Sequence, residues 1–390
     1  MKLYFYILSL LYSVTASNQD MGAEPTQFTW EESASNFDLS LFTYLSSNND
    51  STDFETDDPS PPCDTTVPGF DSIALVVVYL LVSLLSLIGN SVVVFVVCSM
   101  KKGRGSTDIY LMHLAIADLL FCLTLPFWGT YVHYGWTYGN FLCKLLSGFQ
   151  EASVYGGVFL LACISVDRYF AIVRATRVQS SHHQLVKVVC CIVWLVAGLL
   201  SLPVVIKRES MYAYDLNQSI CYENVTGENS DLWQFSLRIL RHTLGFFLPL
   251  AVMTFCYGWT AVTLLQIRNQ QKQKAMRVIM AVVLGFVLCW LPYNVAVLID
   301  TLIQSESLKV ESCDTRYRVE MMLNVTRILA YTHCAVNPVL YAFIGQKFRN
   351  QLLSALHKHG VISKRIQMAY RKGSATSLGS IRSKNTSVTM

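Results

Sequence analysis

The sequence has few charged residues for its length. Of its 390 residues, 14% are charged and 53% are apolar, whereas soluble domains carry about 25% charge. Residues 345–390 contain no Asp or Glu, and residues 18–72 contain no Lys or Arg. A chain of this length could hold roughly two or three soluble domains. Its apolar residues are instead gathered in long blocks, which predicts a single bundle in a lipid membrane.

The sequence also lacks the motifs of common catalytic sites. It has no His-Glu-x-x-His zinc motif and no glycine-rich phosphate loop. Asp118 stands alone in an apolar block, so no pair of carboxylates is available for acid–base catalysis. Residues 321–344 contain no Lys for a retinal Schiff base, and no inverted repeat typical of transporters is found. We therefore expect neither an enzyme, a pump nor a transporter, and neither a metal centre nor a nucleic-acid partner.

Seven apolar blocks are long enough to cross a membrane. A bilayer core of about 30 Å needs roughly 20 helical residues, and the blocks are continuous and not alternating, which favours helices over a β-barrel. The predicted spans are residues 73–100, 109–131, 144–173, 185–206, 238–267, 276–303 and 321–344. The predicted fold is therefore an all-α seven-transmembrane helix bundle.

The basic residues predict the orientation of the bundle. Lys and Arg occur in the loops after the first, third and fifth spans and in the last 46 residues, and such segments stay in the cytoplasm. The N-terminus is then extracellular and the C-terminus cytoplasmic, in a multi-pass protein of the plasma membrane. Residues 1–16 resemble a signal peptide, residues 17–72 form an acidic disordered tail, residues 73–344 form the bundle, and residues 345–390 form a basic tail that begins with a short amphipathic helix. Glycosylation sequons on the outer side begin at Asn49, Asn217 and Asn224.

Four of the twelve cysteines are predicted to lie outside the membrane, namely Cys63, Cys143, Cys221 and Cys313. The outside is oxidising, so they are expected to pair, and the sequence alone allows three connectivities. We favour a Cys143–Cys221 disulfide, which leaves Cys63 for Cys313. The other eight cysteines are expected to act as small apolar residues.

Polar residues inside the predicted spans mark a first candidate site, because they are costly in lipid. Asn90, Asp118, His333 and Asn337 have similar predicted depths. They could form a functional, water-filled polar network, or a purely structural hydrogen-bond network.

A second candidate site lies towards the outer ends of the spans. Glu151, Asp300 and Arg327 could pair with one another or meet a ligand, and Trp128 could line the site or belong to an interfacial aromatic belt. The acidic tail could steer and bind a basic protein, or it could be a solvated, glycosylated stalk. Its closely spaced acids are Asp50, Asp53, Glu55, Asp57 and Asp58.

Several motifs resemble those of the rhodopsin-like G-protein-coupled receptors. Asp167-Arg168-Tyr169 ends the third span, Cys289-Trp290-Leu291-Pro292 lies in the sixth, and Asn337-Pro338-Val339-Leu340-Tyr341 ends the seventh. Thr124-Leu125-Pro126, the residues following Asp167 and the four outer cysteines are further similar to chemokine receptors. Over about residues 60–365, the chain most resembles the CXC chemokine receptors of the interleukin-8 type.

This resemblance implies a ligand and signalling partners. A small basic CXC chemokine would dock its core on the acidic tail and insert its N-terminus into the bundle. The sixth span would then swing outward and expose a switch to an inhibitory G protein, which would drive calcium release and leukocyte chemotaxis. Receptor kinases would phosphorylate the C-terminal tail, to which arrestin would bind. The resemblance also implies a sodium ion near Asp118. The switch residues implied in this way are Asp167, Arg168, Tyr169, Tyr257, Trp290, Pro292, Asn337, Pro338 and Tyr341.

Arg327 departs from the family pattern, since an acidic residue is usual there. The charge that faces the N-terminus of the ligand is thereby reversed. One alternative is a receptor that sequesters a chemokine without G-protein output, against which the intact Asp167-Arg168-Tyr169 argues. Another is a receptor for a different peptide ligand.

Overall fold

The described part of the chain consists of helices and one short β-hairpin. The computed structural model describes residues 72–100, 105–173, 182–214, 217–224, 230–266, 270–304, 312–344, 346–365 and 368. The elements are α2 (Ser72–Ser99), α3 (Ser106–Tyr134), α4 (Gly139–Ile172), α5 (His182–Lys207), β1 (Arg208–Ala213), β2 (Gln218–Glu223), α6 (Ser230–His242), the π-helix η2 (Thr243–Phe247), α7 (Leu248–Gln266), α8 (Gln270–Gln304), α9 (Cys313–Tyr331), α10 (His333–Ile344) and α11 (Gln346–Lys358). The predicted signal peptide, the acidic tail with Cys63, and the residues after 368 lie outside the described residues.

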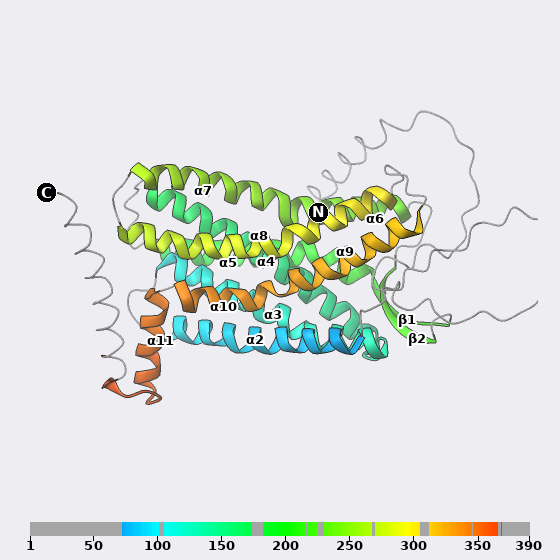
Figure 1. Ribbon diagram of the computed structural model, residues 1–390, viewed down its shortest axis with the longest axis horizontal. Coiled ribbons are helices and arrows are strands. Elements are labelled where there is room, and N and C mark those ends of the chain that lie inside the picture. Colours follow the sequence, from blue (N-terminus) through cyan, green and yellow to red (C-terminus); the bar gives the residue numbers. More distant parts are fainter. Residues whose placement is uncertain are drawn as a thin grey trace, which may run out of the picture.

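The long helices lie side by side and form one bundle (Figure 1). Six stretches within the described ranges are long and apolar enough to cross a membrane: Ile73–Ser99, Ser106–Tyr134, Gly139–Ile172, Gln184–Lys207, Gln234–Thr263 and Ile279–Ile303. The hairpin lies at one end of the bundle and α11 at the other (Figure 1). These are called the hairpin end and the α11 end below.

The seventh predicted span is a broken helix. Instead of one helix over residues 321–344, α9 begins at Cys313, ends at Tyr331, and is followed after Thr332 by α10. The first turns of α9 are polar, and there Arg318 Nη2 lies 2.9 Å from Asp314 Oδ2 in an exposed ion pair. The seventh span therefore consists of two helices, which follow one another along the bundle (Figure 1).

The fifth span contains a local widening of the helix before a proline. Residues Thr243–Phe247 form a π-turn between α6 and α7, and Pro249 follows it. Proline has no backbone N–H, and its ring would clash with the carbonyl group four residues earlier. The wider turn relieves this clash without ending the helix.

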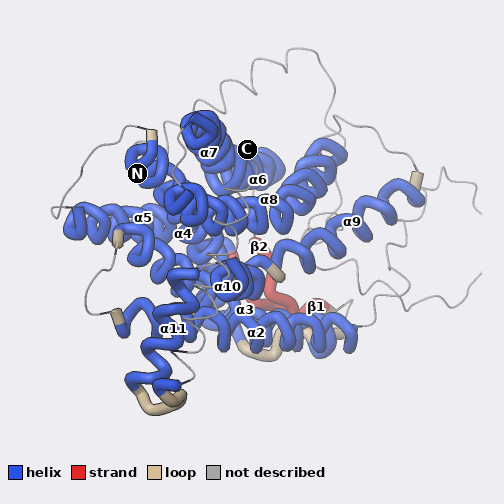
Figure 2. The backbone as a smooth tube through the Cα atoms, turned by 60° about the vertical axis from the view of Figure 1, so that its left-hand side comes forward, coloured by secondary structure: helices blue, strands red, loops and turns tan. Residues whose placement is uncertain are grey.

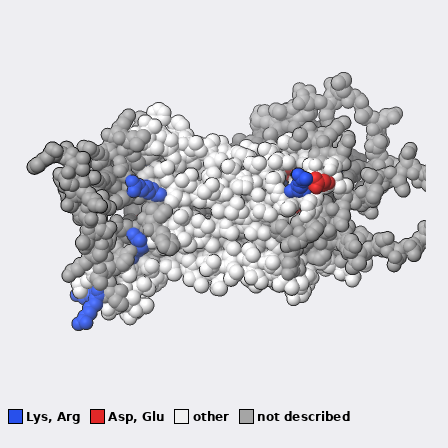
Figure 3. All heavy atoms as spheres, viewed as in Figure 1, with Lys and Arg blue, Asp and Glu red and all other residues white. Residues whose placement is uncertain are grey.

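The bundle buries apolar side chains inside and exposes others outside. Helix α4 packs against α3, α5 and α7, and its Leu160, Leu161 and Ile164 are almost fully buried. On α5, Leu195 and Leu199 are exposed, which suits a lipid-facing surface. On the face of the molecule drawn in Figure 3, the described charged side chains lie near the two ends of the bundle, and none is seen between them. This distribution is that of a membrane-spanning bundle.

The β-hairpin is fastened to the bundle. Strands β1 and β2 are antiparallel and pair Ser210 with Cys221; they are the red segment in Figure 2. The predicted disulfide between Cys143 of α4 and Cys221 of β2 is present, and Trp136 N donates a 2.7 Å hydrogen bond to Ser219 O. The hairpin is therefore held against one rim of the bundle.

Candidate ligand pocket and switch

A pocket lies between the helices near the hairpin end. It holds about 850 Å³ of space between atoms, open solvent at its mouth included. Helices α3, α4, α5, α6, α8 and α9, the π-turn and strand β1 all contribute to its wall. The lining residues include Trp128, Gln150, Glu151, Tyr155, Arg208, Arg241, His242, Phe286, Trp290, Tyr293, Asn294 and Tyr331. A concave site with aromatic walls and a few polar groups is suited to a ligand.

Both predicted acids of this region pair with arginines of the fifth span. Arg241 Nε lies 2.7 Å from Glu151 Oε1, and Arg238 Nη1 lies 3.0 Å from Asp300 Oδ2. Arg327 Nη1 instead donates to the neutral Asn324 Oδ1 at 3.3 Å. Of the two alternatives from the sequence, the acids therefore form ion pairs, and they do so with arginines of the fifth span.

The sequence analysis did not assign a role to Arg238 or Arg241. Their spacing of three residues places them on one face of a helix, which is the signal that could have revealed them. Their partners come from two other helices, α4 and α8, whose order around the bundle hydropathy alone cannot give.

Arg208 is a further cation in the pocket wall. It is only 4% exposed, and its Nη1 donates to the carbonyl oxygen of Cys221 at 3.2 Å. Burial lowers the pKa of the Arg208 guanidinium, and the charge of Arg241 lowers it further, whereas Glu223 and Glu151 raise it. Arg208 thus holds the two strands of the hairpin together and places a guanidinium group in the wall of the pocket.

The deep side of the pocket links the fifth and sixth spans. His242 Nδ1 donates to Asn294 Oδ1 at 2.7 Å, and Asn294 Nδ2 donates to the carbonyl oxygen of Trp290 at 2.9 Å. The ring of Trp290 lies 5.2 Å from that of His333, between centroids. A ligand that contacts His242 in the pocket is therefore connected to Trp290 through these hydrogen bonds.

Trp128 lines the pocket and also belongs to an aromatic cluster at the hairpin end. Its ring centroid lies 5.2 Å from that of Trp136 and 6.0 Å from that of Tyr131, and all three residues are buried. Trp128 thus contacts protein and faces the pocket, which is the first of the two interpretations open from the sequence.

The second outer disulfide can be described on one side only. Cys313, the first residue of α9, is disulfide-bonded. Its expected partner, Cys63, lies outside the described residues. The eight cysteines predicted to lie in the spans are free thiols.

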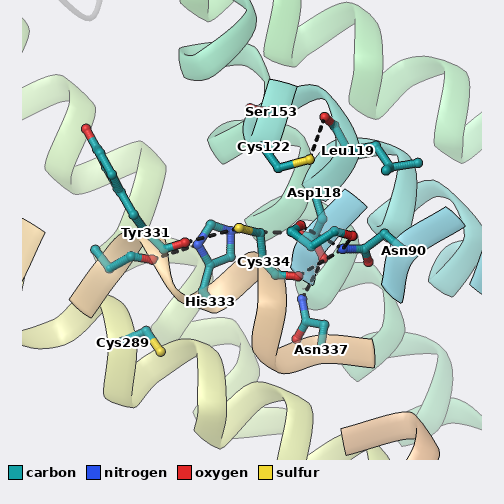
Figure 4. Close-up of polar contacts among 12 residues, drawn as sticks. Asn90, Asp118, Leu119, Cys122, Ser153, Cys289, Tyr331, His333, Cys334 and Asn337 are labelled. Carbon is teal, nitrogen blue, oxygen red and sulfur yellow. Dashed lines mark hydrogen bonds and ion pairs between the residues drawn. The ribbon is translucent and has the colours of Figure 1, made fainter. Parts of the chain in front are cut away.

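The predicted polar network forms around Asp118 (Figure 4). Asn337 Nδ2 donates to Asp118 Oδ2 at 2.8 Å, and His333 Nε2 lies 3.6 Å from Asp118 Oδ1. Asn90 instead donates through Nδ2 to the carbonyl oxygen of Cys334 at 2.9 Å. Asp118 thus joins the second span to the seventh, and Asn90 joins the first span to the seventh.

The sodium ion that the resemblance to the family implies near Asp118 stays a prediction. A hard cation such as sodium prefers oxygen ligands. The contacts given for the carboxylate come from two nitrogen atoms, Asn337 Nδ2 and His333 Nε2.

Several of the predicted switch residues lie towards the α11 end. Arg168 forms an ion pair with its neighbour Asp167, at the end of α4. Tyr257 of α7 and Tyr341 of α10 are buried, while Tyr169 takes no part in the ion pair. These residues lie at the opposite end of the bundle from the pocket, whereas Trp290, another predicted switch residue, lines the pocket.

Two of the predicted glycosylation sites are described. Asn217 is exposed at the hairpin turn with a positive φ of 50°. Asn224 is half-buried, and its Nδ2 donates to Glu209 Oε2 at 2.8 Å. Asn49 lies outside the described residues, so the expectation of glycans remains a prediction.

Comparison with known proteins gives the family. Residues 89–341 match the family described as 7 transmembrane receptor (rhodopsin family). The chain is 48% identical over 303 residues to C-X-C chemokine receptor type 2 of Homo sapiens, covering 78% of this chain and 83% of that one. It is 47% identical over 323 residues to C-X-C chemokine receptor type 1 of Homo sapiens, covering 82% and 91%. It is 46% identical over 316 residues to C-X-C chemokine receptor type 1 of Oryctolagus cuniculus, covering 81% and 88%.

Proteins of this family are receptors and not enzymes, as the sequence analysis concluded. The seven-helix architecture and the disulfide of the hairpin agree with the resemblance seen in the motifs. This chain therefore belongs to the rhodopsin family of seven-transmembrane receptors, within the group of the C-X-C chemokine receptors, and is a multi-pass protein of the plasma membrane.

Proposed function

We propose that the protein binds a basic CXC chemokine and activates a G protein of the inhibitory class. The chain matches the chemokine receptors named above over most of their length. The observation that carries the proposal is the arrangement of two sites along one bundle. A pocket lies near the hairpin end, and Arg168 lies towards the α11 end.

The hairpin end is proposed to face outward. The disulfides at that end suit an oxidising compartment, and basic residues without acids follow α10 at the other end. The chemokine then approaches from the side where the acidic tail begins. Complementary charge would steer its basic core to Asp50, Asp53, Glu55, Asp57 and Asp58.

The inserted N-terminus of the chemokine would act on the sixth span. It would contact the side chains around Glu151 and reach the hydrogen-bonded chain from His242 through Asn294 to Trp290. Pro292 lies inside α8 and would serve as the hinge, because a proline removes a helical hydrogen bond. Outward movement of α8 would open a site for the G protein at Arg168.

The basic C-terminal tail is proposed to take part in regulation. Receptor kinases would phosphorylate its serines and threonines, and arrestin would bind the phosphates. Helix α11 begins this tail at Gln346 and would lie on the inner surface of the lipid bilayer. Calcium release and leukocyte chemotaxis would be the cellular result.

The proposal is tested by displacement of a labelled interleukin-8-type chemokine from cells that express the chain. Activation of an inhibitory G protein is measured on the same membranes. We expect displaceable binding together with nucleotide exchange on the G protein. The variant Arg168→Ala is the matched control: it should keep chemokine binding and lose nucleotide exchange, because Arg168 lies far from the pocket.

Two outcomes would contradict parts of the proposal. Binding without nucleotide exchange by the native chain would indicate a receptor that sequesters its ligand. If no CXC chemokine binds although the chain is at the cell surface, a different peptide ligand must be sought.

A further inference from the structure

Helix α11 ends in a turn with a fixed backbone. The N–H group of Val361 donates to the carbonyl oxygen of Leu356 at 2.9 Å, and that of Gly360 donates to the carbonyl oxygen of His357 at 3.1 Å. Gly360 has a φ of 76°, which lies in the left-handed region that favours glycine. These two hydrogen bonds form a Schellman motif. The chain therefore leaves α11 on a defined path.

The end of α11 lies at the lipid-facing side of the first span. Helix α11 crosses the end of the bundle and reaches past α2 (Figures 1 and 2). There the ring of His359 lies 5.3 Å from the ring of Phe95, between centroids. Phe95 is exposed and stands four residues before Ser99, the end of α2, which is about 6 Å along a helix. The end of α11 is therefore at the boundary between the hydrocarbon core and the headgroups, where lipid phosphates lie.

Three cations lie beside this contact, within residues 358–365, called the α11 turn below. Lys358, Lys364 and Arg365 are all exposed, and none of them takes part in an ion pair within the described residues. Residues 345–390, which include the α11 turn, contain no acid. Figure 3 shows Lys and Arg but no Asp or Glu at this end of the face it draws. The α11 turn therefore presents positive charge to the membrane surface.

The described acids at this end of the bundle have partners of their own. Asp108 Oδ2 accepts a 2.7 Å hydrogen bond from the backbone N–H of Gly105, at the start of α3. Asp167 forms the ion pair with Arg168 at the end of α4. Neither carboxylate pairs with a cation of the α11 turn, so the charge of this turn remains for a ligand.

An apolar side chain stands among the three cations. Val361 is 68% exposed, and an exposed apolar side chain beside cations is typical of a segment that dips into the membrane surface. A palmitoyl group cannot anchor this stretch, since residues 335–390 contain no cysteine. The α11 turn thus offers an apolar anchor together with donors for phosphate at one depth of the membrane.

We propose that the α11 turn binds the headgroup of a phosphoinositide in the inner leaflet, with Lys358, Lys364 and Arg365 on its phosphates and Val361 beside its acyl chains. Clusters of Lys and Arg at the cytoplasmic side of a span recognise such lipids, and phosphate oxygens accept charge-assisted hydrogen bonds from both side chains. A headgroup with a single net charge, such as that of phosphatidylserine, neutralises only one of the three cations. The inference goes beyond chemokine binding and uses only the proposed orientation, in which the α11 end faces the cytoplasm.

The test uses purified full-length receptor in detergent micelles and counts bound lipids by native mass spectrometry. The probes are phosphatidylinositol bisphosphate, phosphatidylserine and soluble inositol trisphosphate. The bisphosphate lipid should bind at least about tenfold more tightly than phosphatidylserine, because each further cation that it neutralises adds to the binding free energy. Inositol trisphosphate should bind more weakly than the lipid, since it lacks the acyl chains that would lie beside Val361.

Charge variants locate the site. The double variant Lys364→Gln, Arg365→Gln removes two cations and should weaken binding of the bisphosphate lipid about 30-fold. The matched control Arg382→Gln, Lys384→Gln removes the same charge further along the tail and should leave the affinity unchanged. The unfolding temperature without added lipid is the check of folding, and both variants should keep the native value.

Variants of Gly360 test the geometry with every charge kept. A Cβ atom at Gly360 meets nothing within 4 Å, so a substitution acts through the backbone. Gly360→Val disfavours the φ of 76°, so it should disturb the turn and bring the affinity for the bisphosphate lipid closer to that for phosphatidylserine. Gly360→Asn tolerates the left-handed conformation and should keep the native selectivity.

Several results would overturn the inference. Equal affinities for the two lipids, or an equal loss of affinity in both double variants, would show a general attraction between a basic tail and any anionic lipid. Equal binding of inositol trisphosphate and the lipid would assign the cations to a soluble phosphate. Native selectivity in Gly360→Val would show that the turn does not hold the site together. None of these measurements involves a chemokine, so failure of the proposed function leaves this inference standing.

Discussion

Replacing Gly89 by alanine should loosen the contact between the first and seventh spans. An ideal Cβ atom on Gly89 would lie 2.7 Å from Cβ and 2.8 Å from Cγ of Pro338. Carbon atoms in favourable contact are about 3.5–4.0 Å apart, so α2 and α10 must separate by roughly 0.7 Å or more. The ring of Pro338 is rigid and cannot turn away.

The separation affects the hydrogen bond beside it. Asn90 Nδ2 donates to Cys334 O at 2.9 Å, and the same movement would stretch this distance beyond the range of a hydrogen bond. Overpacking costs about 1–3 kcal/mol, and loss of the bond adds about 1 kcal/mol. The better helix propensity of alanine returns only about 0.5–1 kcal/mol. The net effect is a destabilisation of about 2 kcal/mol.

The measurement is thermal unfolding of purified receptor in lipid nanodiscs. At about 2–4 °C per kcal/mol, Gly89→Ala should lower the unfolding temperature by about 5 °C. Scan rates must match, since such proteins unfold irreversibly. The control is Gly198→Ala in α5, where a Cβ atom meets nothing within 4 Å, so its unfolding temperature should be unchanged or slightly higher. Equal unfolding temperatures for the two variants would refute the reasoning.

Three further predictions follow from other contacts. Asp167→Asn removes the partner of Arg168 and should raise nucleotide exchange on the G protein without ligand; an unchanged basal rate would show that the pair does not restrain Arg168. Cys143→Ser opens a link to Cys221 over a sequence separation of 78, worth about 4 kcal/mol in the chain-entropy model; it should lower the unfolding temperature and chemokine binding, and native stability would contradict this. The sodium ion expected near Asp118 is tested by replacing sodium chloride with choline chloride: a rise in agonist affinity would indicate the ion, and an unchanged affinity would contradict it.

The positions of most spans could be predicted closely. The fourth predicted span, residues 185–206, corresponds to α5, His182–Lys207. The apolar content of a lipid-spanning segment is high enough that hydropathy alone marks it. The seventh predicted span, residues 321–344, ends where α10 ends, at Ile344, whereas helix α9 already begins at Cys313. Its polar first turns extend beyond the apolar block.

The candidate pocket could be predicted only in part. Glu151 and Asp300 stood out because charges in spans are rare, yet their partners, Arg241 and Arg238, did not. The π-turn before Pro249 was not predicted either, since a proline in a sequence indicates only that the helix must be disturbed. How the helix accommodates it depends on the neighbouring helices.

The sequence by itself determined that the chain forms a membrane bundle of helices, which residues cross the lipid, and which polar groups lie inside it. These properties follow from the cost of placing each residue in lipid, and this cost is local. Only the tertiary structure decided that Arg241 pairs with Glu151 and that Asn337, not Asn90, bonds to Asp118. It also decided that Pro338 packs directly against Gly89. Such contacts join segments far apart in the chain, so they depend on the order and rotation of the packed helices.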